Sequence, residues 1–453
     1  MIAIRRRLIF WLFKAYLRRW GKIILIYFAL GLLVFFVLRS ILGFAINEIT
    51  LARKSTIGIV GAYTIDDLPP SILYKISSGL TSVGDDGAPV SSIAKNWKIE
   101  NNDKTYTFYL KKDIVFSDNI ALTSDLINYS FSDVSIQRPD KHTIVFTLKN
   151  SYSPFLVTVS RPIFKSGFIG VGDYKIDNLK LNGNFVESIR LVAVKNPKDI
   201  ISYQFYPTQD SLKTAFVLSE ISKIASLEDV NFKNTNFYFF RNVSVVKSTN
   251  YHKLVTLFYN TNDKDLSSKT LRESLSYSIP DSFSQGQKSN GSFSPLSFAN
   301  VPGQDLYQQD LEHAKTLLDK YKESASQSAK LSITLLTLPK YKKTAENISS
   351  IWKGIGIETD IKIVNEVPSD FQVFLGDFNL SKDPDQYPLW HSSQISNITH
   401  YNNLRIDKIL EDGRQTTDIE KRKTIYADFQ KYIFSDPPAS FLYFPYVYEV
   451  TRK

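Results

Sequence analysis

The first 46 residues constrain this chain more than any other feature. They hold eight Lys and Arg residues and no Asp or Glu. Seven of these cations precede an apolar run at residues 23–46, IILIYFALGLLVFFVLRSILGFAI, in which Arg39 is the single charge. A helix needs about 20 apolar residues to cross the hydrocarbon core of a bilayer. We therefore predict one transmembrane helix over residues 23–46, with Arg39 near its outer end, where its long side chain reaches the interface.

The basic cluster before the apolar run predicts the orientation of the chain. Positive charge stays on the cytoplasmic side of a membrane, so we expect residues 1–22 to be a cytoplasmic basic segment and the chain after residue 46 to be extracytoplasmic. The alternative is a cleaved signal peptide, but its apolar core is about 7–15 residues long and ends in a small-residue cleavage site, which residues 47–50 lack. Residues 1–20 also suit an amphipathic helix on the inner leaflet, or else an ordinary positive flank without its own helix.

Most of the net positive charge lies in the N-terminal segment. The whole chain carries +10 and residues 1–46 carry +8, which leaves about +2 on the rest. The charge therefore gives no support for nucleic-acid binding. Cysteine is absent, so no disulfide, thiol chemistry or lipidated-cysteine anchor is available. A chain of 453 residues that is 43% hydrophobic can build a body of two or more lobes by core burial alone.

Strand-type and helix-type patterns alternate after residue 55. Alternating β-branched and aromatic residues predict strands at 55–61, 105–111, 142–148, 202–206, 254–259, 331–336 and 371–375. Apolar positions at helical spacing predict helices at 211–218, 268–278, 310–321, 344–353, 406–414 and 419–434. Because the two types are interspersed, the predicted fold class is mixed α/β.

A series of short motifs follows one fixed order along the chain. These are AKNW at 94–97, DKTYTFYLKK at 103–112, FSD at 116–118, LTSD at 122–125, GVGDY at 170–174, LRESLSYSI at 271–279, WKGIGI at 352–357, DPD at 383–385, HS at 391–392, YNN at 401–403 and RKTIY at 422–426. Each motif is weak alone, but their order is specific. Together they make residues 57–445 resemble the family 5 extracellular solute-binding proteins, which are the oligopeptide-, dipeptide- and nickel-binding components of ABC importers.

The resemblance implies a periplasmic-binding-protein-like fold (type II, cluster C) with two α/β lobes, a hinge and an inserted subdomain. Carried onto this chain, it puts the first lobe at 55–75, 166–250 and 436–453, the subdomain at 76–165 and the second lobe at 251–435. It also implies that the motif side chains of the subdomain are core residues of a small sheet: Trp97, Tyr106, Phe108, Leu110 and Phe116. Asn119 stands where the family has Gly in a turn, and Asn tolerates left-handed backbone angles.

The resemblance further implies a binding mechanism and a site. The two lobes close around an extended ligand, whose backbone pairs with strand edges while hydrated pockets accept its side chains. The ligand-contacting residues predicted on this basis are Asp377, Asn379, Ser381, Asp383, Asp385, Trp390, His391, Tyr401 and Asn402. Asp383 and Asp385 have an alternative role, which is to cap a turn and the following helix.

One departure from the family pattern bears on the ligand. Peptide binders of the family place an Asp three residues before the DPD motif, where it holds the α-ammonium of the ligand, and this chain has Leu380 there. Asp377 takes the role only if the loop is rearranged. Losing such a charge-assisted bond costs about 1.5–3 kcal/mol of affinity. Leu380, together with a body that is short for such a binder, favours the alternative function of a surface sensor or scaffold with a degenerate cleft.

Enzymatic motifs are missing from the sequence. It contains no H-E-x-x-H, EF-hand, G-x-S-x-G, Walker or G-x-G-x-x-G pattern, so we expect neither catalysis nor a cofactor. His391 and His400 lie nine residues apart, which is not a zinc-ligand spacing, and a metal role for them rests on the nickel binders of the family. We predict a monomeric, membrane-anchored, extracytoplasmic binding protein. Its expected partners are a peptide or peptide-like solute, ABC permease subunits and the membrane.

Overall fold

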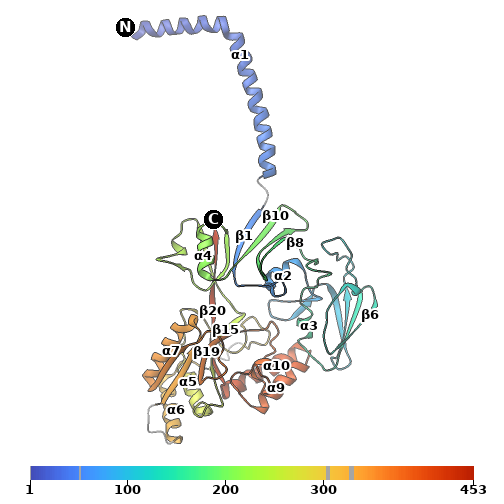
Figure 1. The fold of residues 1–453 in the computed structure, drawn as a ribbon, viewed down its shortest axis with the longest axis vertical. Coiled ribbons are helices and arrows are strands. Elements are labelled where there is room, and N and C mark those ends of the chain that lie inside the picture. The colour runs from blue at the N-terminus through green and yellow to red at the C-terminus, as the bar shows by residue number, and fades with distance from the viewer. Residues whose placement is uncertain (1, 50–52, 302–306, 326–330) are drawn as a thin grey trace. The chain divides into compact units, whose positions relative to one another are not determined.

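The computed structural model of the chain describes residues 2–49, 53–301, 307–325 and 331–453. The chain divides into two compact units (Figure 1). The N-terminal unit comprises residues 1–54 together with 196–200. The second unit, which we call the body, comprises residues 55–195 and 201–453.

The N-terminal unit contains one long helix, α1 (Ile2–Ile49). Within the described residues, no single helix is long and apolar enough to cross a membrane. Two helical stretches, Phe13–Ile23 and Leu25–Ser40, together have the length and composition of a span, and they meet at an angle of 56°. The single transmembrane helix predicted over residues 23–46 is therefore not confirmed, and the side chains of residues 41–46 lie outside the described part of the structure.

One mixed sheet of twelve strands runs through the body. Ten strands lie along one path, in the order β18 (Ile357–Ile363), β17 (Leu331–Thr337), β19 (Val373–Asn379), β15 (Lys253–Tyr259), β20 (Ala439–Arg452), β11 (Lys223–Leu227), β1 (Arg53–Val60), β10 (Asp199–Tyr206), β9 (Phe185–Ala193) and β8 (Tyr174–Asn182). Two further strands, β14 (Val243–Thr249) and β16 (Gly286–Lys288), pair with β20 off this path.

The last strand, β20, belongs to both halves of this sheet. Up to Tyr443 it pairs with β15, and from Tyr446 it pairs with β14 and β11. Pro445 lies between these two stretches, opposite Gly286 of β16. We call the β15 side the second lobe and the β11 side the first lobe. The segment 436–453, which the resemblance assigns to the first lobe, thus begins in pairing with the second lobe.

The strands of the second lobe bury both of their faces. Alternate residues of a strand point to opposite faces, and in β15 the residues Val255, Leu257 and Tyr259 join one core cluster while Leu254 and Phe258 join another. The first cluster is covered by α5 (Lys269–Tyr277), α6 (Leu311–Ser324) and α7 (Lys342–Ile355). The second is covered by α8 (Tyr387–Trp390), α9 (Leu404–Gln415) and α10 (Ile419–Ser435).

Local signals set the ends of these helices. The Asp310 carboxylate accepts a hydrogen bond from the backbone N–H of His313 at 2.8 Å and so caps α6. Gly356 ends α7 with a φ of +96°, a left-handed conformation that glycine adopts without steric cost. The strands and helices predicted from the sequence pattern are all present, with ends that differ by a few residues. The predicted α/β class is confirmed.

The first lobe carries shorter elements around its part of the sheet. They are α2 (Pro70–Ile76), α4 (Gln209–Val217), β12 (Asn231–Phe232) and β13 (Thr235–Asn236). Short 3₁₀ turns occur in the first lobe at η1 (Ile65–Asp67) and η3 (Phe237–Phe239), in the subdomain at η2 (Ser124–Leu126) and in the second lobe at η4 (Pro339–Tyr341). Thr208 caps α4 through a reciprocal pair of hydrogen bonds with Ser211, which fixes where that helix begins.

A separate small sheet forms the subdomain that follows α2. Its four strands are ordered β4 (Ala94–Glu100), β5 (Thr105–Leu110), β7 (Thr143–Leu148) and β6 (Val134–Asp140), and the two-stranded hairpin of β2 (Thr81–Val83) and β3 (Pro89–Ser91) and the helical turn α3 (Phe155–Thr158) accompany them. Tyr106, Phe108, Leu110 and Phe116 are buried in its core, as predicted. Trp97 is half-buried and packs against the same cluster.

The predicted turn around Asn119 is also confirmed. Asn119 has a φ of +65°, and its backbone N–H donates to the Phe116 carbonyl at 2.9 Å. Asn is one of the few residues with a side chain that adopts this left-handed conformation readily. The replacement of Gly by Asn at this position therefore preserves the turn.

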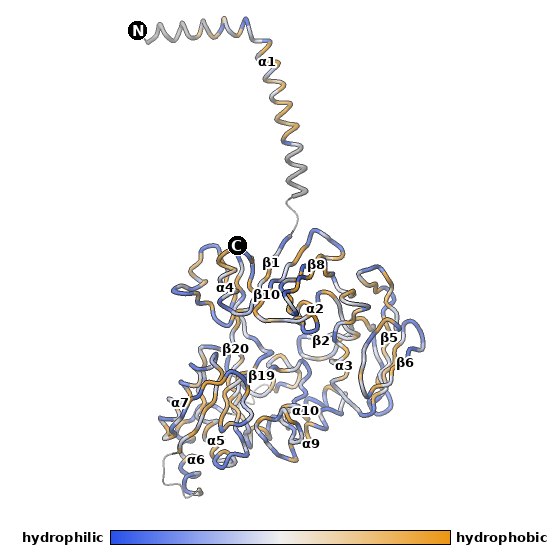
Figure 2. The backbone as a smooth tube through the Cα atoms, viewed as in Figure 1, coloured by the Kyte–Doolittle hydropathy of each residue, from blue (hydrophilic) through white to orange (hydrophobic). Residues whose placement is uncertain are grey.

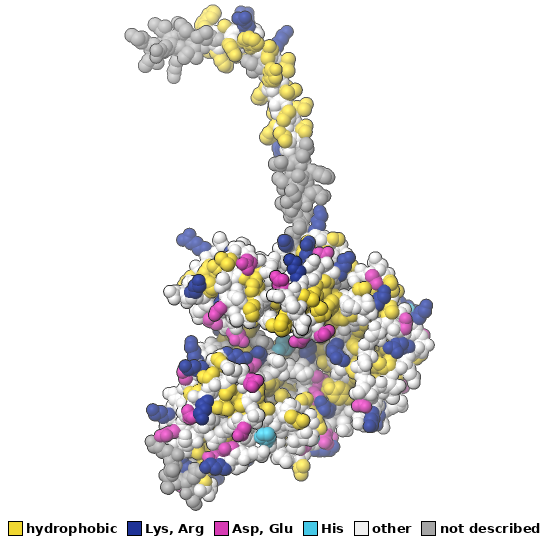
Figure 3. Space-filling model, viewed as in Figure 1, with side chains coloured by type: hydrophobic (Ala, Val, Ile, Leu, Met, Phe, Trp, Pro, Cys, Tyr) yellow, Lys and Arg dark blue, Asp and Glu magenta, His cyan; other side chains and the backbone are white. Residues whose placement is uncertain are grey.

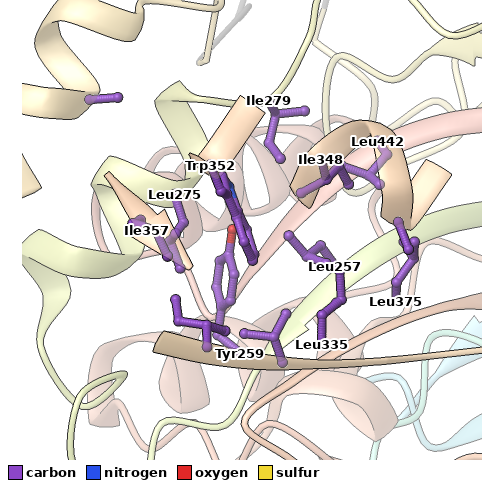
Figure 4. Close-up of a cluster of buried hydrophobic side chains, with 14 of the residues drawn as sticks. Leu257, Tyr259, Leu275, Ile279, Leu335, Ile348, Trp352, Ile357, Leu375 and Leu442 are labelled. Carbon is purple, nitrogen blue, oxygen red and sulfur yellow. The ribbon is translucent and has the colours of Figure 1, made fainter. Parts of the chain in front are cut away.

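Trp352 is the residue on which we expect the core of the second lobe to depend most. Its side chain is fully buried among the first cluster (Figure 4). Its indole N–H donates to the Ser278 hydroxyl at 2.9 Å. Trp352→Ala should lower the free energy of unfolding by about 3–5 kcal/mol, because it leaves a cavity and removes the hydrogen bond to Ser278. Denaturant unfolding of the intact chain in detergent measures this loss. Ile395→Ala, at a fully exposed position, is the control and should change stability by about 0.5 kcal/mol or less.

Candidate ligand-binding cleft

A cavity of about 440 Å³ lies between the tip of the β2–β3 hairpin and the second lobe. Figure 3 shows one face of the body hollowed between its lobes. Four stretches of chain line the cavity: the hairpin tip, the residues before β15, a loop after β16 and the residues after β19. The lining residues are Val83, Gly84, Asp85, Gly87, Tyr251, His252, Ser294, Leu296, Ser297, Leu380, Ser381 and Lys382.

A smaller cavity of about 170 Å³ adjoins the first. The two share Ser294, Ser297, Leu380 and Ser381 as lining residues, so they form one continuous cleft. The smaller cavity extends along the second lobe toward the start of α8. Four of the nine predicted ligand contacts line it, namely Asn379, Ser381, Asp383 and Asp385.

The hairpin tip is held against the second lobe by its backbone. The Phe298 N–H donates to the Asp86 carbonyl at 2.7 Å. Gly87 has a φ of +81°, and a Cβ at this position would lie 2.8 Å from the Lys382 carbonyl oxygen. The Lys382 ammonium lies 4.7 Å from the centre of the Tyr74 ring. The hairpin, α2 and the second lobe therefore meet around the cleft with no room for a side chain at position 87.

Asp383 forms the most deeply buried ion pair of the cleft wall. Its carboxylate accepts two hydrogen bonds from the Arg422 guanidinium, at 2.6 and 2.9 Å, and the two side chains are only 3% and 4% exposed. Arg422 also donates to the Gly413 carbonyl and the Tyr426 hydroxyl. The Asp383 carboxylate also accepts the Asp385 N–H at 2.9 Å, which is the turn-capping role that the sequence left open beside a ligand contact.

Asp385 pairs with Arg414, a residue whose backbone contacts the subdomain. Its carboxylate pairs with Arg414 at 2.9 Å and accepts the Tyr387 N–H at 3.1 Å, which is the capping role foreseen for it. The Arg414 carbonyl accepts the N–H of Ser153, a subdomain residue, at 2.7 Å. Burial raises the pKa of the Asp385 carboxyl even though the Arg414 guanidinium opposes this shift.

Asp377 does not line either cavity. Its carboxylate pairs with the ammonium groups of Lys340 at 2.7 Å and Lys253 at 3.1 Å. Burial alone would raise its pKa, but the hydrogen bond from Lys340 and the charge of Lys253 outweigh burial and hold the pKa below its usual range. The two lysines occupy the carboxylate, so the rearrangement that would make Asp377 an ammonium anchor has to break both pairs.

Trp390 and His391 lie behind the cleft wall. The Trp390 ring is fully buried in the second core cluster, and its indole N–H donates to Gln386 at 2.9 Å. The His391 ring stacks on Tyr387 with 4.1 Å between ring centres. The Ser393 N–H donates to His391 Nδ1 at 3.2 Å. Nε2 is buried and lies 3.5 Å from the Glu411 carboxylate.

Tyr401 and Asn402 precede α9, away from both cavities. Tyr401 is buried, and its hydroxyl donates to the Asp436 carboxylate at 3.2 Å. Asn402 is exposed. None of the described His, Cys, Asp and Glu side chains form a group of three or more that could hold a metal ion. All nine predicted contacts stay predictions, of which the structure brings four together at one cleft.

The sequence pattern missed three residues that line the larger cavity. They are Asp85 at the hairpin tip, His252 before β15 and Lys382 after β19. The sequence Gly-Asp-Asp-Gly at 84–87 is a turn signal, but nothing in it indicates that the turn meets the second lobe. Pairing of β15 with β19 brings His252 close to Leu380, whose N–H donates to the His252 carbonyl at 2.8 Å.

The two cleft aspartates should differ in their contribution to stability. Asp383→Asn leaves the buried Arg422 charge without its partner and should lower the free energy of unfolding by about 3–5 kcal/mol. Asp385→Asn should cost about 1 kcal/mol, because Arg414 is partly exposed and water can solvate it. Denaturant unfolding of both variants measures the difference. Equal losses would contradict the assignment of Asp383 as the structural pair.

Gly87 should control how closely the hairpin tip sits on the second lobe. In Gly87→Ala the added Cβ would collide with the Lys382 carbonyl oxygen, and alanine disfavours the left-handed φ of this position. The hairpin tip should therefore move away from the second lobe, and the Phe298 N–H should lose its acceptor. Hydrogen exchange at the Phe298 amide should then be at least tenfold faster. Gly183→Ala is the matched control, since Gly183 has a φ of +61° but no atom within 4 Å of its Cβ position. Equal exchange in both variants would show that the Gly87 contact does not hold the tip.

The sequence model of the family described as "Bacterial extracellular solute-binding proteins, family 5 Middle" matches residues 88–399. The curated relatives include the oligopeptide-binding protein AppA of Bacillus subtilis, which is 24% identical over 84% of this chain and 83% of its own. Among solved structures, the substrate-binding protein CtaP of Listeria monocytogenes has a TM-score of 0.73 at 20% identity, covering 88% of this chain and 94% of its own.

A further solved structure extends the likeness to metal-complex binders. NikZ of Campylobacter jejuni, solved in complex with Ni(L-His), has a TM-score of 0.71 at 18% identity and covers 89% of this chain and 94% of its own. Similarity at these identities shows the two-lobed fold. The sequence match over most of the body shows the family. The chain therefore belongs to the family 5 bacterial extracellular solute-binding proteins.

Proposed function

We propose that this chain is a membrane-anchored, extracytoplasmic protein that captures peptides or peptide-like solutes and delivers them to the permease subunits of an ABC importer. The observation that carries the proposal is the cleft between the hairpin tip and the second lobe. Relatives named as dipeptide-binding and oligopeptide-binding proteins support this ligand class. Opening and closing of the two lobes would admit and release the solute.

The lining of the cleft suits a peptide-like ligand. The hydroxyls of Ser294, Ser297 and Ser381 offer donors and acceptors to a peptide backbone, and Tyr251 and Leu296 offer apolar surface for side chains. Among the nine predicted contacts, Asn379 and Ser381 are exposed at the cleft, so we propose them as direct ligand contacts. Asp383 and Asp385 act through the wall they stabilise. A single body encloses the cleft, so a monomer suffices for binding.

The same fold offers a second candidate function, a surface sensor or scaffold. Leu380 favours it, because this apolar side chain lines both cavities at the position where peptide binders of the family place an anchoring Asp. A ligand with a free α-ammonium would lose its charge-assisted bond there. The sensor would use closure of the lobes as its signal, and the transport protein would use it for delivery.

Native mass spectrometry separates these two functions. The intact chain in detergent is incubated with a mixed peptide library, and bound peptides are identified after gentle release. Transport predicts captured peptides and a rise in the thermal unfolding temperature that grows with peptide concentration. Absence of both at every concentration would contradict peptide capture and leave the sensor or scaffold.

Leu380→Asp tests how the cleft treats a free amino end. An added carboxylate should bind the α-ammonium of a tripeptide and tighten its dissociation constant by about tenfold or more, since a charge-assisted hydrogen bond contributes about 1.5–3 kcal/mol. Calorimetry with the tripeptide and its N-acetylated form gives the comparison. Leu380→Asn is the control, with the same size and no charge. An equal gain for the acetylated peptide would contradict the role of position 380.

A further inference from the structure

The first half of α1 carries two opposed stripes of side chains. Residues three or four apart share one face of a helix. Lys14, Arg18 and Lys22, at a spacing of four, form a basic stripe. The apolar stripe consists of Phe13, Tyr16, Leu17 and Trp20, each at least 43% exposed. At 3.6 residues per turn the centres of the two stripes lie about 150° apart around the helix.

The helix changes its composition where it bends. Phe13–Ile23 and Leu25–Ser40 meet at 56°. The first stretch contains four cations, whereas the second contains only Arg39. Figure 2 shows the same change, from mixed hydropathy before the bend to apolar residues after it. The bend therefore separates a segment that suits an interface from a segment that suits the hydrocarbon core.

A position at the lipid interface would suit both the basic stripe and the apolar stripe. An amphipathic helix with Lys and Arg on one face and aromatic or aliphatic residues on the other lies in the plane of an interface. Transmembrane helices tilt by about 20° on average, so a preceding segment turned by 56° leans toward the membrane plane. Anionic lipids of the cytoplasmic leaflet attract Lys and Arg near the surface, and residues 1–46 contain no acid to oppose them.

We propose that residues 13–23 form an amphipathic helix bound to anionic lipid headgroups on the cytoplasmic leaflet, with Phe13, Leu17 and Trp20 toward the acyl chains. This inference rests on the membrane anchor of the proposed function and adds a lipid-binding segment to it. A plain positive flank in water would leave the apolar stripe hydrated. A continuation of the span would put the cations of the basic stripe into hydrocarbon, which is costly.

The cysteine-free sequence allows a direct test. Two single-cysteine variants are made, Leu17→Cys on the apolar stripe and Ala15→Cys. Position 15 lies about 200° around the helix from position 17, and neither change removes a charge. Each full-length variant is labelled with an environment-sensitive fluorophore in bilayer discs of phosphatidylcholine, with or without phosphatidylglycerol. We expect a blue-shifted, quencher-protected label at position 17 and a water-exposed label at position 15 in the anionic discs.

Charge dependence identifies the lipid partner. The contrast between the two positions should shrink in discs of phosphatidylcholine alone, and also in the variant Lys14→Gln/Arg18→Gln/Lys22→Gln. Equal exposure of both labels in anionic discs indicates a flank in water, and equal burial indicates a broken span; either result overturns the inference. A contrast that does not depend on phosphatidylglycerol overturns the anionic partner.

Failure of the anchor itself has a different signature. The same chains are reconstituted in vesicles and washed with alkaline carbonate. Release from the vesicles contradicts the anchor of the proposed function, whatever the labels show. Retention with equal labels contradicts only the lipid-binding segment. Far-UV circular dichroism of each variant confirms that the label leaves the helix and the body folded.

Discussion

Strand β20 is the constraint on which the two-lobed body depends, because it is hydrogen-bonded into the sheets of both lobes. The pairing changes at Pro445, which lacks an N–H and so contributes no donor to the ladder. Its carbonyl accepts the N–H of Asn250 at 2.9 Å, and Asn250 lies in the short connection from β14 to β15. The chain passes between the lobes in this connection and again in β20, and the hydrogen bond between Asn250 and Pro445 joins the two passages. A rotation of the lobes that keeps both ladders intact has to pivot there.

Two ion pairs hold one wall of the cleft in place. On the second-lobe side, Asp383 and Asp385 are matched by Arg422 and Arg414. Removing one member of a buried ion pair destabilises the fold by more than the intact pair stabilises it, because the remaining charge is left buried without a partner. Such pairs therefore hold their residues in place. The two carboxylates therefore hold the wall of the cleft in place. The larger cavity is lined by Asp85 from the hairpin tip and by His252 and Lys382 from the second lobe.

Periodicity predicted what depends on near neighbours in the sequence. The helices of the second lobe and the strand around Phe108 follow from local spacing. The small sheet and the turn at Asn119 were expected from the resemblance to the family, and the left-handed φ of Asn119 agrees with the backbone preference of Asn. Contacts between distant segments did not follow: Asp383 and Arg422 both lie in recognised motifs, yet 39 residues separate them and nothing in either motif pairs them. The bend in α1 also escaped prediction, because an apolar run gives the length of a helix and not its straightness.

Main-chain groups join the subdomain to the second lobe beside the cleft. The Phe298 N–H meets the Asp86 carbonyl, and the Ser153 N–H meets the carbonyl of Arg414. Backbone groups are present whatever the side chain, so these contacts survive substitution of the residues that supply them. The exception is Gly87, where any Cβ would collide with the opposite lobe. A substitution at a cleft position such as Leu380 should therefore leave these main-chain contacts in place.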